Sequence, residues 1–290
     1  MIATVTGVSR RFGDNAALDG VSFALRENTI YGLLGRNGAG KTTLMQILTG
    51  QQFATAGTVE VMGAPPAEND SVLAQTCFVR ENLRYPEWFR VGHALRAAAA
   101  LHPHWDAAFA ESLVDEFRLP RRRPMKKLSR GMLSAVGVIV GLASRAPLTL
   151  FDEPYLGLDA VARQLFYDRL LADYAEHPRT VVLSTHLIDE VADLVEQQHV
   201  LDQGRLLVDE STERLRGRVL SVTGSAAAVD RFAATRVELS RTTLGPTVRA
   251  TVRGDAADAT AAADLGLRVE PVSLQQLVVG LTAASKGADR

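Results

Sequence analysis

The stretch Gly35-Arg36-Asn37-Gly38-Ala39-Gly40-Lys41-Thr42 (residues 35–42) follows the apolar run Ile30–Leu34. It fits the pattern G-x-x-x-x-G-K-[ST], a glycine-rich loop between a strand and a helix. Glycines let backbone N–H groups close around phosphate oxygens, and the helix N-terminus adds positive potential. We expect Lys41 to reach the phosphates and the Thr42 hydroxyl to bind Mg²⁺. The stretch therefore predicts a nucleotide-binding loop.

A second apolar run, residues 148–151, ends in two carboxylates, Asp152 and Glu153. Charges at the end of a buried strand are costly unless other groups compensate them. Because neighbouring strand residues point to opposite sides, the two carboxylates can serve different partners. We expect Asp152 to hold the Mg²⁺ shell and Glu153 to polarise an attacking water. A strand that simply ends in solvent is the alternative.

Three shorter motifs are informative only when their order along the chain is considered. Ser129, in Leu128-Ser129-Arg130-Gly131-Met132, is a good helix N-cap, and the helix that follows would make a second anion site. Gly157-Leu158-Asp159 follows Glu153, and His186 follows the apolar run 181–184. Taken singly, Ser129 is an ordinary cap and His186 an ordinary histidine at a strand end.

In this order the motifs resemble the ATP-binding cassette (ABC) family over roughly residues 1–215. GRNGAGKTT matches its Walker A, LSRGM its signature, LTLFDEP its Walker B, GLD its D-loop and STH its switch histidine. Arg11-Phe12-Gly13 resembles the A-loop, whose aromatic residue stacks on adenine. The stretches 85–88 and 102–106 are similar to a bacterial ABC-2-type exporter branch whose genes often lie beside GntR-type regulators, which favours export over import.

The resemblance implies that Mg-ATP is bound between two cassette copies, in a homodimer or heterodimer, and hydrolysed there. Glu153 and His186 would be catalytic, and Thr42, Asp152 and Glu81 would hold the metal. The nucleotide would contact Phe12, Gly35, Asn37, Gly38, Ala39, Gly40, Lys41, Thr42, Thr43, Ser129, Gly131 and Asp159. Three positions depart from the family pattern: Glu81 and Met132 stand where glutamine is commonest, and Tyr155 where threonine is usual.

The alternation of strand and helix patterns up to residue 216 predicts an α/β fold with a parallel, doubly wound sheet. The resemblance makes this a P-loop cassette with a mixed sheet and a helical subdomain at about 85–145. We expect strands at 2–6, 21–25, 30–34, 58–61, 148–151 and 181–184, a hairpin at 200–208, and helices at 41–48, 94–101, 105–117, 130–144, 161–174 and 187–194.

Residues 217–290 lack these motifs. Their pattern predicts β-α-β-β-α-β, a small ferredoxin-like α+β unit. Val248, Ala250 and Val252 alternate with polar residues, and Val237 and Leu239 do the same, as in strands with one buried face. A last helix would carry the apolar stripe Leu274, Leu277, Val278 and Leu281. We expect an accessory domain that regulates or stabilises the dimer, with this stripe docked on the cassette or on the partner copy.

The composition of the chain limits the partners and the cellular location that we expect for it. The 290 residues are 47% hydrophobic and 22% charged, with net charge −1, so no global positive field attracts nucleic acid and no nucleic-acid partner is expected. A single cysteine, Cys77, excludes an intrachain disulfide and favours a reducing cytoplasm. The apolar run 135–143 is far short of the roughly 20 residues that span a bilayer. We therefore expect a peripheral protein on the cytoplasmic side of the membrane that works with a separate membrane subunit.

Two other functions compete with a transporter ATPase. The first is a soluble cassette ATPase that acts on ribosomes or DNA. Ribosomal types usually carry two cassettes in one chain, and DNA-repair types insert a long coiled coil, for which the 87 residues between Lys41 and Ser129 (128 − 41) leave no room. The second is a degenerate regulatory cassette, against which the intact Lys41, Asp152, Glu153 and His186 argue.

Overall fold

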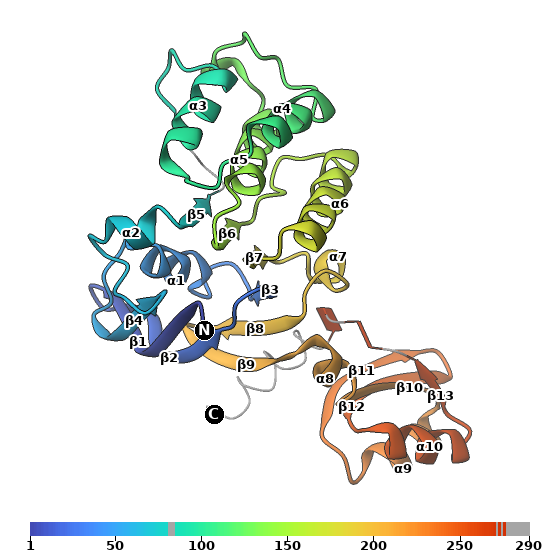
Figure 1. Cartoon of the computed structure of the whole chain (residues 1–290). Helices are drawn as coiled ribbons and strands as arrows, with labels where there is room; N and C mark the ends of the chain where they lie inside the picture. Colours follow the sequence, from blue (N-terminus) through green and yellow to red (C-terminus); the bar gives the residue numbers. More distant parts are fainter. Residues whose placement is uncertain (81–84, 271, 274, 277–290) are drawn as a thin grey trace. The chain divides into compact units, whose positions relative to one another are not determined.

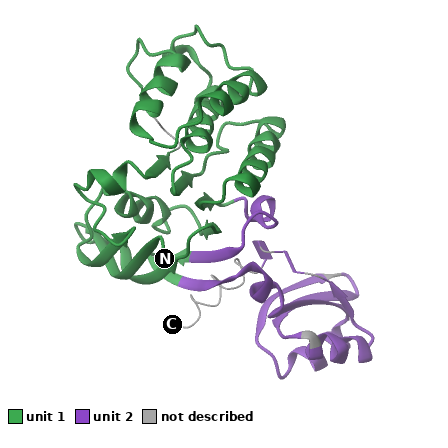
Figure 2. Ribbon diagram, viewed as in Figure 1, with its two compact units in different colours: residues 1–186, 201–206 green, residues 187–200, 207–290 purple. Residues whose placement is uncertain are grey.

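The structure is a computed structural model that describes residues 1–80, 85–270, 272, 273, 275 and 276. The chain divides into two compact units, residues 1–186 with 201–206 and residues 187–200 with 207–290 (Figure 2). Strands β8 (Gln197–Asp202) and β9 (Arg205–Ser211) each contribute residues to both units. Glu81 and the predicted stripe Leu274, Leu277, Val278 and Leu281 lie outside the described residues.

The first unit begins with a three-stranded antiparallel sheet. Its strands are β1 (Ala3–Phe12), β2 (Asn15–Leu25) and β4 (Ala56–Val61), in the order β2-β1-β4 (Figure 1). β1 and β2 form a hairpin that ends with Phe12 paired to Asn15. Both strands are longer than the sequence predicts, because register shifts between Val5 and Arg11 interrupt the alternation by which a strand is recognised.

The main sheet carries the chemistry-bearing residues at its strand ends. Strands β5 (Thr76–Val79), β6 (Leu148–Asp152), β7 (Thr180–Thr185) and β3 (Ile30–Leu34) run parallel in that order, and β8 and β9 continue the sheet. Every residue of β3, β6 and β7 is buried, as expected for parallel strands covered on both faces. Since the strands are parallel, Leu34, Asp152 and Thr185 finish at the same edge.

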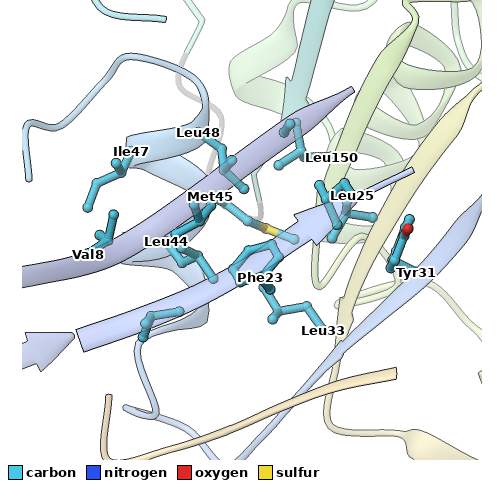
Figure 3. Close-up of a cluster of buried hydrophobic side chains, with 14 of the residues drawn as sticks. Val8, Phe23, Leu25, Tyr31, Leu33, Leu44, Met45, Ile47, Leu48 and Leu150 are labelled. Carbon is cyan, nitrogen blue, oxygen red and sulfur yellow. The ribbon is translucent and has the colours of Figure 1, made fainter. Parts of the chain in front are cut away.

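The helices of the first unit are α1 (Lys41–Leu48), α2 (Asp70–Leu73), α3 (Val91–Leu101), α4 (Ala107–Glu116), the 3₁₀ turn η1 (Met125–Lys127), α5 (Arg130–Ser144) and α6 (Ala160–Glu176). α1 and α5 contact strands of the sheets, whereas α3 and α4 pack on α5 (Figure 1). The apolar face of α1 joins the core between the two sheets, where Leu44 and Met45 belong to one buried cluster with Phe23 and Leu150 (Figure 3). This packing fixes the helix whose first residue is Lys41.

The second unit opens with α7, which is shorter than predicted. It spans Ile188–Val191 rather than 187–194, because residues 192–194 form turns, in which the Leu194 N–H bonds three residues back to the Val191 carbonyl. α8 (Thr212–Arg216) follows β9.

The remaining described elements are β10 (Val219–Ser225), α9 (Ala226–Ala233), β11 (Glu238–Leu244), β12 (Thr247–Arg253), α10 (Ala256–Asp264) and β13 (Arg268–Glu270). This is the expected β-α-β-β-α-β order, and the sheet is antiparallel with strand order β11-β12-β10-β13. Val248, Ala250 and Val252 are buried as predicted, in a core with Phe232. The prediction for Val237 is wrong: this residue precedes β11 and is 55% exposed, because the strand begins one residue later.

The contact between α5 and β6 depends on Gly141. A Cβ there would lie 2.6 Å from Cζ of Phe151 and 2.8 Å from Cγ2 of Val79. Both distances are shorter than the separations that Cβ atoms have from non-bonded atoms in proteins. The absence of a side chain thus lets α5 approach the strand that ends in Asp152.

We predict that Gly141→Ala lowers the free energy of unfolding by about 1–2 kcal/mol, because overpacking of about 1–3 kcal/mol outweighs a helix-propensity gain of up to about 1 kcal/mol. Urea unfolding measures the difference. Gly92→Ala in α3 is the matched control, since a Cβ there would meet one Arg96 atom at an ordinary 3.7 Å. Equal stability of the two variants would show that α5 is not held at this distance.

Candidate functional site

Positive φ and close neighbours together require glycine at two positions of the loop between β3 and α1. Gly35 has φ 153° and Gly40 has φ 106°, in the region that favours glycine. A Cβ at Gly40 would lie 2.5 Å from the carbonyl oxygen of Ala17, and one at Gly35 within 3.0 Å of that of Leu201. The loop therefore packs closely against the backbone at Ala17 and at Leu201. α1 begins directly after Gly40.

Lys41 is buried at the start of α1, with 5% of its surface exposed. Its Nζ donates to the carbonyl oxygens of Gly35 (2.7 Å) and Arg36 (3.3 Å), and it lies 3.7 Å from Oε1 of Glu153. Burial lowers the pKa of the ammonium from its ordinary value, and the negative charges of Glu153 and Asp152 oppose that shift. The loop thus holds a poorly hydrated cation, which an incoming anion would stabilise.

Two oxygen ligands of the kind that Mg²⁺ prefers meet beside Lys41. The Thr42 hydroxyl donates to Oδ2 of Asp152 at 2.7 Å, and the Ser184 hydroxyl donates to Oδ1 at 2.9 Å. β6 and β7 pair Asp152 with Ser184, so the register of the parallel strands sets this contact. Mg²⁺ binds through one or two protein oxygens together with water and phosphate, so Thr42 and Asp152 fit such an ion.

Glu153 and His186 form a pair at the ends of β6 and β7. Glu153 has φ 48°, a left-handed conformation that is uncommon for a non-glycine residue and that ends the strand. Its backbone N–H donates to the Ser184 carbonyl at 3.2 Å. Oε2 of Glu153 lies 3.0 Å from Nδ1 of His186, while Oε1 faces Lys41. One carboxylate thus connects the histidine to the lysine.

A pocket of about 950 Å³ joins these groups, large enough for a nucleotide. Eleven of the predicted site residues line it: Phe12, Asn37, Gly38, Ala39, Gly40, Lys41, Thr42, Thr43, Asp152, Glu153 and His186. The sequence did not indicate the other lining residues, Asn15, Ala16, Ala17, Arg130, Leu156 and Gln203. Arg130 could have been found from its place beside Ser129. The alanines and Gln203 come from hairpin positions that only the packing of the strands identifies.

Four predicted residues, Gly35, Ser129, Gly131 and Asp159, are described but do not line the pocket. Gly35 acts through its carbonyl on Lys41. Ser129 and Asp159 cap helices: their side chains accept from the N–H groups of Met132 (3.2 Å) and Ala162 (2.8 Å).

Gly131 lies against the D-loop of the same chain. A Cβ there would come within 3.0 Å of the Gly157 carbonyl oxygen. The signature loop and the D-loop therefore form one packed surface.

Phe12 is the last residue of β1 and lines the pocket with 45% of its surface exposed. The guanidinium carbon of Arg10 lies 4.5 Å from the centroid of its ring. A large exposed aromatic residue beside a phosphate loop is suited to stacking on a flat base.

Comparisons with known proteins agree with this geometry. A family model described as ABC transporter matches residues 18–156. A Bacillus subtilis protein named putative ABC transporter ATP-binding protein AlbC is 34% identical over 61% of this chain and 78% of its own length. The Nod factor export ATP-binding protein I of Mesorhizobium japonicum is 32% identical over 72% of this chain and 63% of its own length, and ABC transporter ATP-binding protein YtrB of B. subtilis is 25% identical over 63% of each chain. The matches thus span less than two thirds of these last two relatives.

Solved structures of ABC transporter subunits have a similar fold. A solved structure titled as the ATP binding subunit of an ABC transporter superposes with a TM-score of 0.68 and 25% sequence identity, over 74% of this chain and 92% of that one. The predicted P-loop cassette fold is thereby confirmed for the part of the chain that matches.

We predict that Phe12→Ala weakens ATP binding about tenfold, because the loss of base–aromatic stacking costs about 1–3 kcal/mol. Phe12→Tyr and Phe12→Trp should bind within about twofold of the parent, since each keeps an aromatic face. Titration calorimetry with ATP measures the affinities. Phe53→Ala is the control, because Phe53 is also exposed (63%) but does not line the pocket. If Phe12→Ala binds ATP as Phe53→Ala does, adenine stacks elsewhere.

Proposed function

Because this chain belongs to the ABC transporter family of ATP-binding, ATP-hydrolysing subunits, we propose that it binds Mg-ATP in a cassette dimer and hydrolyses it to drive export through a separate membrane subunit. One observation carries the proposal. Lys41, Thr42, Asp152, Glu153 and His186 come from three different strand ends and converge on one pocket of nucleotide size.

The phosphate loop binds the nucleotide. Its N–H groups and Lys41 hold the β- and γ-phosphates, which replace the carbonyl partners that Lys41 has in the structure. Thr42 and Asp152 hold Mg²⁺, whose charge neutralises the phosphate oxygens. Glu81 is proposed as a further metal-sensing residue on the family resemblance alone.

Glu153 acts as the general base. Its carboxylate lies at the strand end beside Lys41 and His186, where it can accept a proton from a water that attacks the γ-phosphate. His186 lines the pocket and donates to the terminal phosphate. The left-handed backbone of Glu153 supports this role, since such strain persists where the surroundings hold a functional side chain in place.

The signature loop acts on the nucleotide of a second copy. Ser129 and Gly131 do not line the pocket of their own chain, yet Ser129 caps a helix of 15 residues whose N-terminus favours an anion. A partner's γ-phosphate at this end would complete both sites when two copies pair head to tail. Gly157, packed next to it, and Asp159, two residues further on, would lie in the same interface.

Transport and localisation follow from the family and its members. The relatives named for Nod factor export support an export function for this chain. Among the described residues, no helix has the length and apolar character needed to cross a membrane. From the family alone, we assign the chain to the cytoplasmic face of the cell membrane, on a separate integral subunit. Residues 217–290 are assigned as an accessory domain that stabilises or regulates the dimer.

We predict that Glu153→Gln slows ATP hydrolysis at least about 100-fold, as expected for loss of a positioned base. The amide keeps the shape of the carboxylate, so ATP affinity should stay within about threefold and the closed dimer should accumulate with ATP. Phosphate release and size-exclusion chromatography measure the two effects. Glu60→Gln, an exposed acid on β4, is the control. Hydrolysis at the control's rate would exclude Glu153 as the base.

We predict that Ser129→Arg and Lys41→Ala chains are each inactive alone but recover up to about one quarter of the parent's ATPase activity when mixed equally. Random pairing makes half of the dimers mixed, and each mixed dimer has one intact composite site, since a site takes Lys41 from one copy and Ser129 from the other. Phosphate release from the mixture measures the recovery. Mixed dimers that form without recovered activity would show that Ser129 acts within its own chain.

A further inference from the structure

Tyr155 stands where the ABC family usually has threonine, two residues after Glu153, and it is buried with 2% of its surface exposed. Its side chain reaches the end of β7. The Thr185 hydroxyl donates to the Tyr155 hydroxyl oxygen at 2.9 Å, and the backbone N–H of His186 donates to the same oxygen at 3.1 Å. The two rings of Tyr155 and His186 lie edge to face, with centroids 5.8 Å apart. Threonine is too short to make these contacts.

The same hydroxyl lies 3.1 Å from Nδ1 of His186. A phenolic oxygen has one proton to give, and here it already accepts from two donors. At this distance the hydroxyl can donate its own proton to the ring nitrogen, and Nδ1 is then the acceptor. A neutral imidazole with an accepting Nδ1 carries its proton on Nε2, because one nitrogen donates and the other accepts.

Glu153 competes for the same nitrogen. Its Oε2 lies 3.0 Å from Nδ1, and the Tyr155 hydroxyl 3.1 Å, so two side chains converge on one hydrogen-bonding position. A carboxylate can only accept. Glu153 can therefore hold Nδ1 only when Nδ1 carries a proton, whereas Tyr155 can hold it when Nδ1 does not.

We propose that Tyr155 is a positioning residue that keeps the proton of neutral His186 on Nε2, so that this nitrogen donates into the nucleotide pocket and Glu153 is left to accept from water. His186 lines the pocket and its side chain is 40% exposed, which gives Nε2 access to a ligand. The hydroxyl also anchors the backbone of His186, so one side chain sets both the place and the tautomer of the histidine. This inference rests on the proposed function for its catalytic consequence, but not for the tautomer.

The test is Tyr155→Phe in the full chain, which removes the hydroxyl and keeps the ring. Tyr31→Phe is the matched control: Tyr31 is also 2% exposed, and its hydroxyl also accepts from a backbone N–H, that of Arg26 at 2.6 Å. Nitrogen NMR of ¹⁵N-histidine-labelled, nucleotide-free protein reports which ring nitrogen of His186 is protonated, with His186→Gln to assign the signals. We expect the parent and Tyr31→Phe to show the Nε2–H form, and Tyr155→Phe to shift toward Nδ1–H, donated to Glu153.

Hydrolysis gives the second readout. At metal sites, loss of a residue that orients a ligating histidine costs about 10-fold to 100-fold in activity. We expect kcat of Tyr155→Phe to fall by about the same factor. KM for ATP should stay within about twofold, because the phosphate loop is untouched. Tyr31→Phe should keep the parent's kcat even if it loses similar stability.

An Nδ1–H form in the parent, or an unchanged Nε2–H form in Tyr155→Phe, would overturn the inference. So would an equal fall of kcat in the two phenylalanine variants, which would reflect stability alone. A parent that shows the Nε2–H form but no hydrolysis, alone or with its membrane subunit, would instead count against the proposed function.

Discussion

The hydrogen bond between Thr42 and Asp152 joins the two halves of the site, and the rest of the arrangement depends on it. Thr42 belongs to the helix after β3, and Asp152 is the last residue of β6, 110 residues further along the chain. β7 lies between the two strands and pairs with both, with Leu34 opposite Thr185 and Asp152 opposite Ser184. A shift of one residue in the register between β6 and β7 would turn the Asp152 side chain to the other face of the sheet.

The register matters for the charged side chains of the site because these side chains are buried. Lys41 and Asp152 are almost fully buried, at 5% and 6% exposure, and Glu153 lies between Lys41 and His186. A buried charge that loses its partner is strongly destabilising, by about 3–5 kcal/mol in measured cases. Lys41 therefore offsets the two neighbouring carboxylates before any nucleotide is present, and a site that is already assembled needs little rearrangement to bind phosphate.

The residues at the ends of β6 and β7 are positioned by different contacts. At Asp152 the contacts are set by the sheet, through Ser184 and Thr42. At His186 they come from two side chains: Tyr155, which accepts from the segment that carries the histidine, and Glu153, whose carboxylate lies 3.0 Å from the ring nitrogen. The signature loop is held differently again, with Gly131 against Gly157 and Ser129 used as a helix cap. This packing within the chain accounts for the shape of the loop.

From the sequence alone we could predict the phosphate loop, the carboxylates after the apolar strand and the order of elements. These features follow from local requirements, because the loop needs glycine, buried strands need apolar runs and helices begin at capping residues. The sequence predicted α7 too long and β1 too short, since helix ends and bulged strands are set by contacts that no local pattern contains. Only the tertiary structure brought Ala17 and Gln203 to the pocket and Tyr155 to His186. Tyr155 and His186 are 31 positions apart in the chain, and the pairing of strands decides that such distant residues meet.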